Sequence, residues 1–398
     1  MTFSDLTTAT SHRGGFRLVL TSLALMMAGA SAPSPFYPIL QQSMGFSSAM
    51  MTGIFAVYAV ALLVTLLIAG SVSDHLGRRP VLSAGFALLS LSIILFWQAQ
   101  GVGLLLIARI LQGVASGLLL SCLSAAAVDL EPKDRPGAAA IWNSVLPLGG
   151  LALGALLAGV VLDYGQAPMA EVFGGFALIF AALAVLVWLL PETAPCHEGL
   201  LSALRPRIGL PRAARAAFWR SAPAVFAGWA TGGLYLSLGA PIISHVFGVT
   251  DYALQALVIT LLAGSGSLSC FAARGKSARA ITLYGTTALA LGTVLTVIGL
   301  VSQILPLYLG AVLVAGTGFG TCFYGVMRSV TPLAAADERA ELFATLFTLS
   351  YLAFGVPVVV AGLALPHLGL TLTGAIYGGV IVVFAGAAGL WRKFGTTE

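Results

Sequence analysis

Apolar runs long enough to cross a membrane alternate with short polar turns along the chain. A bilayer core about 30 Å thick requires about 20 helical residues. With that length, the pattern predicts spans at 16–38, 47–70, 79–99, 102–126, 138–161, 169–190, 221–245, 251–272, 280–301, 306–327, 341–364 and 370–391. Each backbone amide in lipid must be bonded within its own segment, so we predict an all-α membrane protein with twelve transmembrane helices.

The predicted spans form two sets of six, separated by a polar stretch. We predict an N-terminal six-helix bundle at 1–190, a cytoplasmic linker at 191–220 and a C-terminal six-helix bundle at 221–398. Residues 134–135 (Asp-Arg) after the fourth span resemble residues 338–339 (Glu-Arg) after the tenth, which favours a duplication. Halves related in this way place a substrate site at their interface, near the middle of the membrane.

Basic residues follow the same alternation. Of the 19 Lys and Arg, all but Arg109 lie at the termini or in every second loop. None occurs in the intervening loops at 39–46, 162–168, 246–250, 302–305 and 365–369. The positive-inside rule therefore predicts a multi-pass protein of the inner (plasma) membrane with both termini in the cytoplasm.

Composition agrees with lipid as the solvent of this chain. Hydrophobic residues make up 59% of 398 positions and charged residues only 8%, against about 25% charged in soluble domains. The basic loops account for the net charge of +5, so we expect no nucleic-acid partner. Ala30, Ser31 and Ala32 end the first apolar run as a signal-peptide cleavage site would, but the six-span repeat favours a retained first helix.

Cysteine and histidine usage argues against other classes of protein. The four cysteines show no CxxC or Cys/His spacing, so we expect free thiols, no metal site and no cofactor. The five histidines lie singly outside the spans or at their ends, which argues against a polytopic membrane enzyme. The chain has no P-loop, so ATP is not the expected energy source. A channel or a non-transporting receptor is the other alternative.

The strongest motif lies between the second and third spans and reads Gly70-Ser-Val-Ser-Asp74-His75-Leu-Gly77-Arg78-Arg79. It resembles the G-x-x-x-D-R/K-x-G-R-K/R signature of the major facilitator superfamily, with His75 in place of the usual cation. The gating residues that the resemblance implies are Gly70, Asp74, Gly77, Arg78, Arg79 and, as an ion partner at the end of the fourth span, Asp129. A generic basic loop is the alternative, but it does not explain the glycine and aspartate spacing.

A second motif begins at Arg109 and Gln112 in the fourth span, where R-x-x-Q-G resembles a pattern of facilitator drug exporters. Positions 109, 112, 113, 116 and 117 share one helical face. A charge within a bilayer costs at least a few kcal/mol, so we expect this face to line the bundle interior. Because Arg109 is near the outer end of its span, a side chain that snorkels to the headgroups is the alternative.

The fifth span carries a stripe of small residues that predicts close helix packing: Gly149, Gly150, Gly154 and Gly159. Exporters of the superfamily often carry a Gly-Pro pair here, whereas this chain has Gly154-Ala155 and an earlier Pro147. The antiporter signature is therefore partial. It favours efflux, with uptake as the alternative.

Rare polar and aromatic residues within the spans are further candidates for substrate binding or coupling: Trp142, Asn143, Trp229, Tyr235, Gln255, Tyr324 and Tyr351. For Asn143, a hydrogen bond between helices is an equal alternative to a substrate contact. None of the fourteen acidic residues lies near the middle of a predicted span. Exporters of cations commonly place a carboxylate there, because it attracts cations strongly at low dielectric.

Together these features predict a secondary active transporter that moves a small neutral or anionic amphipathic solute by alternating access. We expect proton-coupled efflux, with protons passing through span-end acids such as Asp129 or Asp163. The alternative is an uptake permease for a small organic metabolite. The expected partners are the solute, protons and the lipid bilayer, and we expect a monomer that is not an enzyme.

Overall fold

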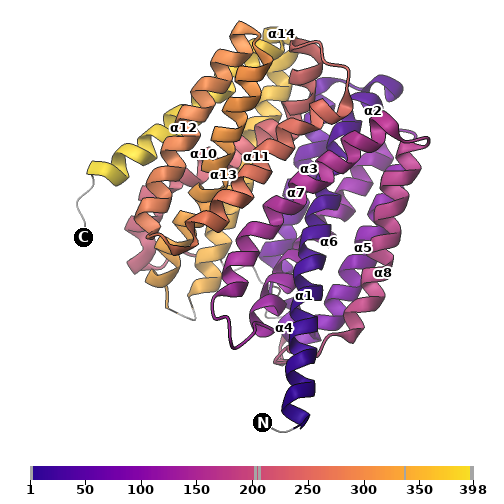
Figure 1. The fold of residues 1–398 in the computed structure, drawn as a ribbon, viewed down its shortest axis with the longest axis vertical. Helices are drawn as coiled ribbons and strands as arrows, with labels where there is room; N and C mark the ends of the chain where they lie inside the picture. The colour runs from indigo at the N-terminus through magenta and orange to yellow at the C-terminus, as the bar shows by residue number, and fades with distance from the viewer. Residues whose placement is uncertain (1–2, 201–203, 205–207, 336–337, 395–398) are drawn as a thin grey trace.

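The computed structural model describes residues 3–200, 204, 208–335 and 338–394, and all regular structure in these residues is helical. Figure 1 shows long helices arranged as a single bundle. The N-terminal half contains α1 (Phe3–Ser31), η1 (Ser34–Phe36), α2 (Tyr37–Met44), α3 (Ser48–Ala69), α4 (Val72–Leu76), α5 (Arg78–Trp97), α6 (Val102–Asp129), α7 (Ala138–Tyr164), η2 (Ala170–Gly174), α8 (Gly175–Leu186) and η3 (Val187–Leu189). The C-terminal half contains α10 (Arg212–Pro241), η4 (Ile242–Val246), α11 (Tyr252–Ala272), η5 (Ala273–Gly275), α12 (Ala278–Ser302), α13 (Leu305–Val330), η6 (Thr331–Leu333) and α14 (Arg339–Phe394).

The described residues contain twelve helical segments long and apolar enough to cross a membrane, counting the last helix as two. Eleven helical segments are long and apolar enough to span, and the last of them, Glu341–Arg392, has 52 residues. A straight helix of that length would extend about 80 Å, far beyond a bilayer core of about 30 Å. Gly369 breaks it, because its φ of 72° and ψ of 170° are not helical. The predicted twelve-helix, all-α architecture is therefore confirmed.

The predicted boundaries differ from the structure at two places. The first crossing is a composite, because α1 ends at Ser31 and the proline-containing η1 and α2 complete it. Proline lacks a backbone N–H and interrupts the helical bonding. In addition, α10 begins at Arg212 after Pro211, so the last part of the predicted linker is helical. Residues 201–203 and 205–207 of that linker lie outside the described residues.

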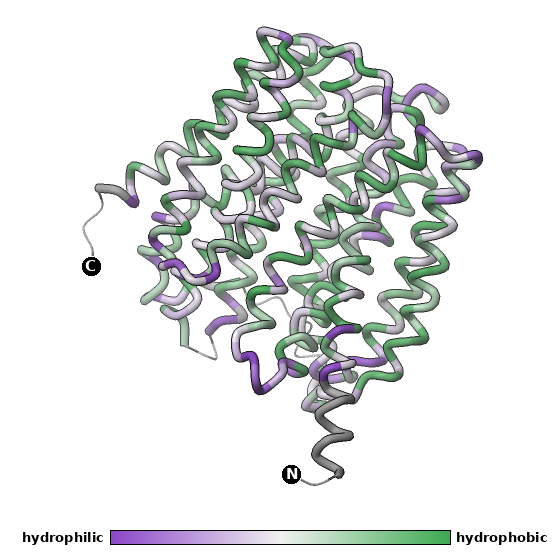
Figure 2. Tube along the Cα trace, viewed as in Figure 1, coloured by the Kyte–Doolittle hydropathy of each residue, from purple (hydrophilic) through white to green (hydrophobic). Residues whose placement is uncertain are grey.

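The two halves lie side by side, the N-terminal half in indigo to magenta and the C-terminal half largely in orange to yellow (Figure 1). Hydrophilic positions gather near the helix ends, as Figure 2 shows. Large apolar side chains such as Leu153 and Leu178 are 65% and 74% exposed, which suits a surface solvated by lipid tails. We call the end that carries Arg78, Arg274 and Arg328 the basic end, and the other the non-basic end.

Two helix pairs join the halves, α3 with α14 and α7 with α11. The predicted glycine stripe of α7 explains part of this contact. A Cβ at Gly159 would lie only 2.7 Å from the Cβ of Ala256 on α11, so a side chain there would force the halves apart. A Cβ at Gly154 would lie even closer to the backbone carbonyl oxygen of Ala28 on α1. The stripe therefore allows α7 to pack tightly within its own half and across the boundary.

Candidate functional site

Arg109 of α6 points into the N-terminal half and is only 1% exposed, so the snorkelling alternative is wrong. Its Nε donates to the hydroxyl of Tyr37 at 2.5 Å, and its Nη1 donates to Oε1 of Gln112. The guanidinium also lies 5.1 to 5.6 Å from the ring centroids of Tyr37, Tyr58 and Phe96. Aromatic faces attract a cation most strongly where water is absent, so these rings stabilise the buried charge.

One donor of this guanidinium is unused. Nη2 of Arg109 is buried and has no hydrogen-bond partner among the described residues. Gln112 does not supply one, because its Nε2 donates to the Gly29 carbonyl at 3.1 Å and its Oε1 already accepts from Nη1. A buried donor on a charged group is costly to leave unbonded. The site therefore has a free positive hydrogen-bonding position, which an anionic or carbonyl oxygen would satisfy.

An aromatic cluster extends from this region into the C-terminal half. Trp229 of α10 lies against Tyr351, Phe354 and Phe323, with ring centroids 4.8, 6.1 and 5.5 Å away. Phe354 of α14 in turn contacts Phe55 of α3 at 5.1 Å, across the boundary between the halves. We call these five residues the central aromatic cluster. Phe55 lies one helical turn from Tyr58 on α3, which connects the cluster to Arg109.

The signature motif forms a compact ionic network at the basic end. Arg78 is 7% exposed, and its Nη1 donates to Asp74 at 2.5 Å and to the Ser73 hydroxyl at 2.6 Å. Its Nε donates to Asp129 at 3.2 Å, so the predicted ion partner is in place. Gly77, with a φ of 101°, separates α4 from α5 in a conformation that favours glycine.

Glu192 completes this network, although the sequence had suggested no role for it. Its carboxylate accepts from the backbone N–H groups of Arg78 and Arg79 at 2.8 and 3.1 Å, and from those of Thr193 and Ala194 at 3.0 Å each. Burial alone would raise the pKa of Glu192, but these four hydrogen bonds outweigh it and hold the pKa below its ordinary value. Glu192 thereby binds the first turn of α5, whose N–H groups have no helical partners.

The residue that departs from the signature also has a partner in the linker. Nδ1 of His75 lies 2.8 Å from the carbonyl oxygen of His197, and the backbone N–H of His197 donates to the carbonyl of Asp74 at 3.1 Å. These bonds, like those of Arg78, join parts of the N-terminal half and the segment that follows it.

The halves are joined by an acidic residue at the non-basic end. Asp163 of α7 accepts from the backbone N–H groups of Tyr252 and Ala253, at 2.9 and 2.8 Å, in the first turn of α11. A carboxylate there satisfies free N–H groups and the positive end of the helix dipole. Asp251 directly precedes α11 but makes no capping bond with its side chain.

Five predicted candidates lie apart from the central aromatic cluster. Tyr235 is enclosed within the C-terminal half beside Tyr308, with ring centroids 6.5 Å apart. Tyr324 lies near the basic end, beneath the guanidinium of Arg328. The other three are Trp142, which contacts Phe271 of α11, Asn143, which donates to the Ser124 carbonyl, and Gln255, which lines a cavity at the non-basic end.

Some residues of the site had no signal in the sequence. Tyr37, Tyr58 and Phe96 surround Arg109 from three other helices, and Phe55 and Phe354 meet across the two halves. Aromatic residues are common in spans, and nothing in their spacing indicates which of them face one cation. Pro33, Pro35 and Pro38 beside Tyr37 are a local signal that could have predicted the interrupted helix there.

Two halves of long apolar helices, a buried cation within the N-terminal half and an ionic motif at one end define a polytopic membrane protein of the transporter type. The model of the Major Facilitator Superfamily matches residues 19–357, and the chain belongs to this family of transporters, which are not enzymes. The confirmed fold and signature motif agree with this membership.

Curated relatives match over part of their length. The chain is 29% identical to the puromycin resistance protein pur8 of Streptomyces alboniger, over 38% of this chain and 30% of the relative. It is 26% identical to multidrug resistance protein 1 of Bacillus subtilis, over 46% of each. It is 28% identical to the inner membrane transport protein YnfM of Escherichia coli, over 49% of this chain and 47% of the relative. The matches thus span about half or less of these relatives.

A likeness in fold extends over nearly the whole chain. The crystal structure of the human organic anion transporter MFSD10 (TETRAN) superposes with a TM-score of 0.69, covering 95% of this chain and 99% of that one. The identity is 18%, so this likeness supports the fold alone.

Proposed function

We propose that the protein is a secondary active transporter that moves a small neutral or anionic amphipathic solute by alternating access. The observation that carries the proposal is Arg109, a cation that is 1% exposed at the edge of an aromatic cluster shared by both halves. A buried charge of this kind is costly and usually marks a substrate or ion pathway.

The sign of that charge supports the proposed substrate class. Asp129 and Asp163, the acidic residues proposed to couple transport, lie at the ends of α6 and α7 and not beside Arg109. An apolar, aromatic region with one cation and an unused N–H donor favours neutral or anionic oxygen-bearing molecules over dications. Transport then proceeds by the two halves changing their relative tilt around this region, without covalent chemistry.

We propose export from the cytoplasm as the direction and protons as the coupling ion. The multidrug resistance and puromycin resistance names of the relatives support export. Proton coupling would run through Asp129 or Asp163, which lie at opposite ends of the membrane. We further propose the inner membrane as the location, with the basic end in the cytoplasm, since basic loops are retained on that side. An uptake permease is the alternative.

The test is transport by purified protein in proteoliposomes, with an imposed pH gradient of either sign and matched neutral, anionic and dicationic compounds. We expect transport of the first two classes to exceed that of dications and to reverse with the gradient. Arg109→Ala should abolish transport, and Arg109→Lys should keep a fraction, because lysine retains the charge but loses the planar fork.

Arg274→Ala is the matched control, since Arg274 also lies over an aromatic ring, 4.2 Å from the centroid of Phe271, but is exposed at the basic end. It should transport as the wild type does. Normal transport by Arg109→Ala, or a strong preference for dications, would contradict the proposed site. If transport does not respond to the pH gradient in either direction, the proposed proton coupling is contradicted and the proposed site is not.

A further inference from the structure

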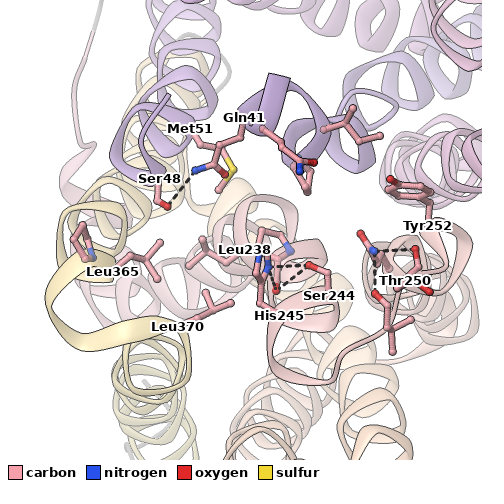
Figure 3. Close-up of a pocket in the computed structure, with 17 residues that line it drawn as sticks. Gln41, Ser48, Met51, Leu238, Ser244, His245, Thr250, Tyr252, Leu365 and Leu370 are labelled. Carbon is pink, nitrogen blue, oxygen red and sulfur yellow. Dashed lines mark hydrogen bonds between the residues drawn. The ribbon is translucent and has the colours of Figure 1, made fainter. Parts of the chain in front are cut away.

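A cavity of about 830 Å³ lies at the non-basic end, between the two halves (Figure 3). One wall comes from α2 and the start of α3, and carries Gln41, Gln42 and Ser48. The opposite wall comes from η4 and the start of α11, and carries His245 and Gln255. The volume lies within the range of about 300 to 1,000 Å³ that is usual for small-molecule sites.

The lining combines polar and apolar groups without an acidic or strongly basic side chain. None of the 17 lining residues is Asp, Glu, Lys or Arg. Amide, hydroxyl and imidazole groups alternate with the apolar side chains of Met51, Leu238, Leu365 and Leu370, as Figure 3 shows. Such a lining suits a molecule that has both an apolar body and hydrogen-bonding groups, and it offers no counterion to a cation.

One buried polar atom in this lining lacks a partner. Gln255 is 3% exposed, and its Nε2 donates to the carbonyls of Val249 and Thr250 at 3.1 and 3.4 Å. Its Oε1 accepts no hydrogen bond from any described residue. A buried acceptor is costly to leave without a hydrogen bond. A hydroxyl or amide N–H of a molecule bound beside Gln255 would supply the missing bond.

The facing wall is held in position by bonds of its own. Nε2 of Gln41 donates to the hydroxyl of Ser48 at 3.3 Å, which ties α2 to the start of α3. Across the cavity, Ser244 and the Pro241 carbonyl lie 3.0 and 3.2 Å from Nδ1 of His245, as the dashed lines in Figure 3 show. Both walls therefore present fixed polar groups to the space between them.

We propose that this cavity is a second binding site, reached from the non-basic face, for a neutral amphipathic molecule that carries hydrogen-bond donors. A molecule bound there contacts both halves at once, so it binds best when these ends are together. By linkage, it stabilises that arrangement and opposes their separation. A solute present on this face would then inhibit its own transport. Only this consequence rests on the proposed transport function; binding does not.

The test uses a reporter cysteine in purified protein in lipid nanodiscs, where both faces are accessible. Cys196→Ser removes the exposed cysteine, and Cys122, Cys270 and Cys322 are buried. Gln42→Cys places a thiol at the cavity, because Gln42 is exposed and lines it. Ser43→Cys is the matched control, since Ser43 is its exposed neighbour on α2 and does not line the cavity.

The probes are chloramphenicol, which is neutral and amphipathic with hydroxyl and amide donors, and tetraphenylphosphonium, a lipophilic cation. Chloramphenicol at about twice its Kd should slow maleimide modification of Gln42→Cys about threefold, because about one third of the sites stay free. Modification of Ser43→Cys should not change. Tetraphenylphosphonium should protect neither cysteine.

Loss of recognition is tested with Gln255→Leu and, on the other wall, Gln41→Leu, each checked for folding by its thermal unfolding midpoint. Each should raise the Kd of chloramphenicol, measured from its protection of Gln42→Cys, about two- to tenfold, as expected for one hydrogen bond. The proposal is overturned by equal slowing at both cysteines, by no slowing with chloramphenicol, by better protection with tetraphenylphosphonium, or by full protection in both leucine variants.

This result is separable from the proposed function. Protection of Gln42→Cys in a protein that transports nothing would support the site and contradict the transporter. Transport without protection would remove the site and leave the transporter. Transport that is slowed by chloramphenicol on the non-basic face, and no longer slowed in Gln255→Leu, would support the inhibitory consequence.

Discussion

The N-terminus of α11 is capped by a residue of the other half of the protein, and its removal should change how the halves separate. Asp163 of α7 binds the N–H groups of Tyr252 and Ala253, whereas Asp251, the residue just before α11, does not cap with its side chain. These bonds exist only while the non-basic ends are together. We therefore expect Asp163→Ala to favour the arrangement in which these ends are apart.

The expected size follows from the two interactions that are lost. Removing an N-cap side chain costs about 1 kcal/mol, and removing a negative charge from a helix N-terminus costs about 0.3–1 kcal/mol. The combined loss of about 1.3–2 kcal/mol corresponds to a shift of about ten- to thirtyfold in the ratio of open to closed molecules, at about 1.4 kcal/mol per tenfold. Asp163→Asn keeps an acceptor without the charge, so its shift should be smaller.

The assay is the distance distribution between spin labels at Ser43→Cys and Leu368→Cys, two exposed positions at the non-basic end of different halves, in a Cys196→Ser background. Asp163→Ala should increase the ratio of the long-distance to the short-distance population about ten- to thirtyfold. Asp251→Ala is the control, because Asp251 directly precedes α11 and stays beside its N-terminus in both arrangements, so removing its charge should change the ratio less than about twofold. An equal effect of the two alanine variants, or none from Asp163→Ala, would refute the reasoning.

Three further predictions concern the basic end. Asp74→Asn should leave membrane insertion intact but slow transport at least about tenfold. The arrangements of the two halves differ in free energy by only a few kcal/mol, so the loss of one ion pair shifts their ratio. Wild-type transport rates in proteoliposomes would exclude a gating role. The pKa of Glu192 lies below its ordinary value in the folded protein. The ionised carboxylate therefore stabilises the folded protein fully at pH values above the ordinary carboxyl pKa, and this stabilisation is lost as the pH falls through the lowered pKa of Glu192. Glu192→Gln should accordingly lower the thermal midpoint at pH 7, and the difference from wild type should vanish in acid; a difference independent of pH would argue against this cause. Cys196 is exposed in the segment after α8, so an impermeant thiol reagent should label it in inverted vesicles and not in intact cells, and the reverse would overturn the proposed orientation.

The pattern of apolar lengths determined most of the architecture. Spanning segments are local properties of a chain in lipid, because each must satisfy its own backbone and match a fixed thickness. Hence the twelve membrane-spanning segments could be predicted, and the family signature at Asp74 and Arg78 recognised, without knowing which helices contact each other. The boundaries that were wrong lie where local chemistry changed the helix, at the prolines before Tyr37 and at Pro211 before α10.

What the sequence could not predict is which side chains from other helices surround Arg109. Arg109 was recognisable as a costly charge in a span, but its neighbours Tyr37, Tyr58 and Phe96 come from other helices and share no spacing with it. The interior of a helix bundle is decided by helix rotation and tilt, which depend on packing between segments far apart in sequence.

For the same reason, only the packing of the helices determines which acidic residues form hydrogen bonds to another helix. Sequence alone placed Asp163 at a span end, and only the position of α7 beside α11 made it the cap of α11. Glu192 likewise became part of the Arg78 network because the chain after α8 returns to the start of α5. The sequence therefore determined how many helices cross the membrane and in which order, while tertiary packing decided which side chains form the site, because a hydrogen bond requires atoms within about 3 Å of each other.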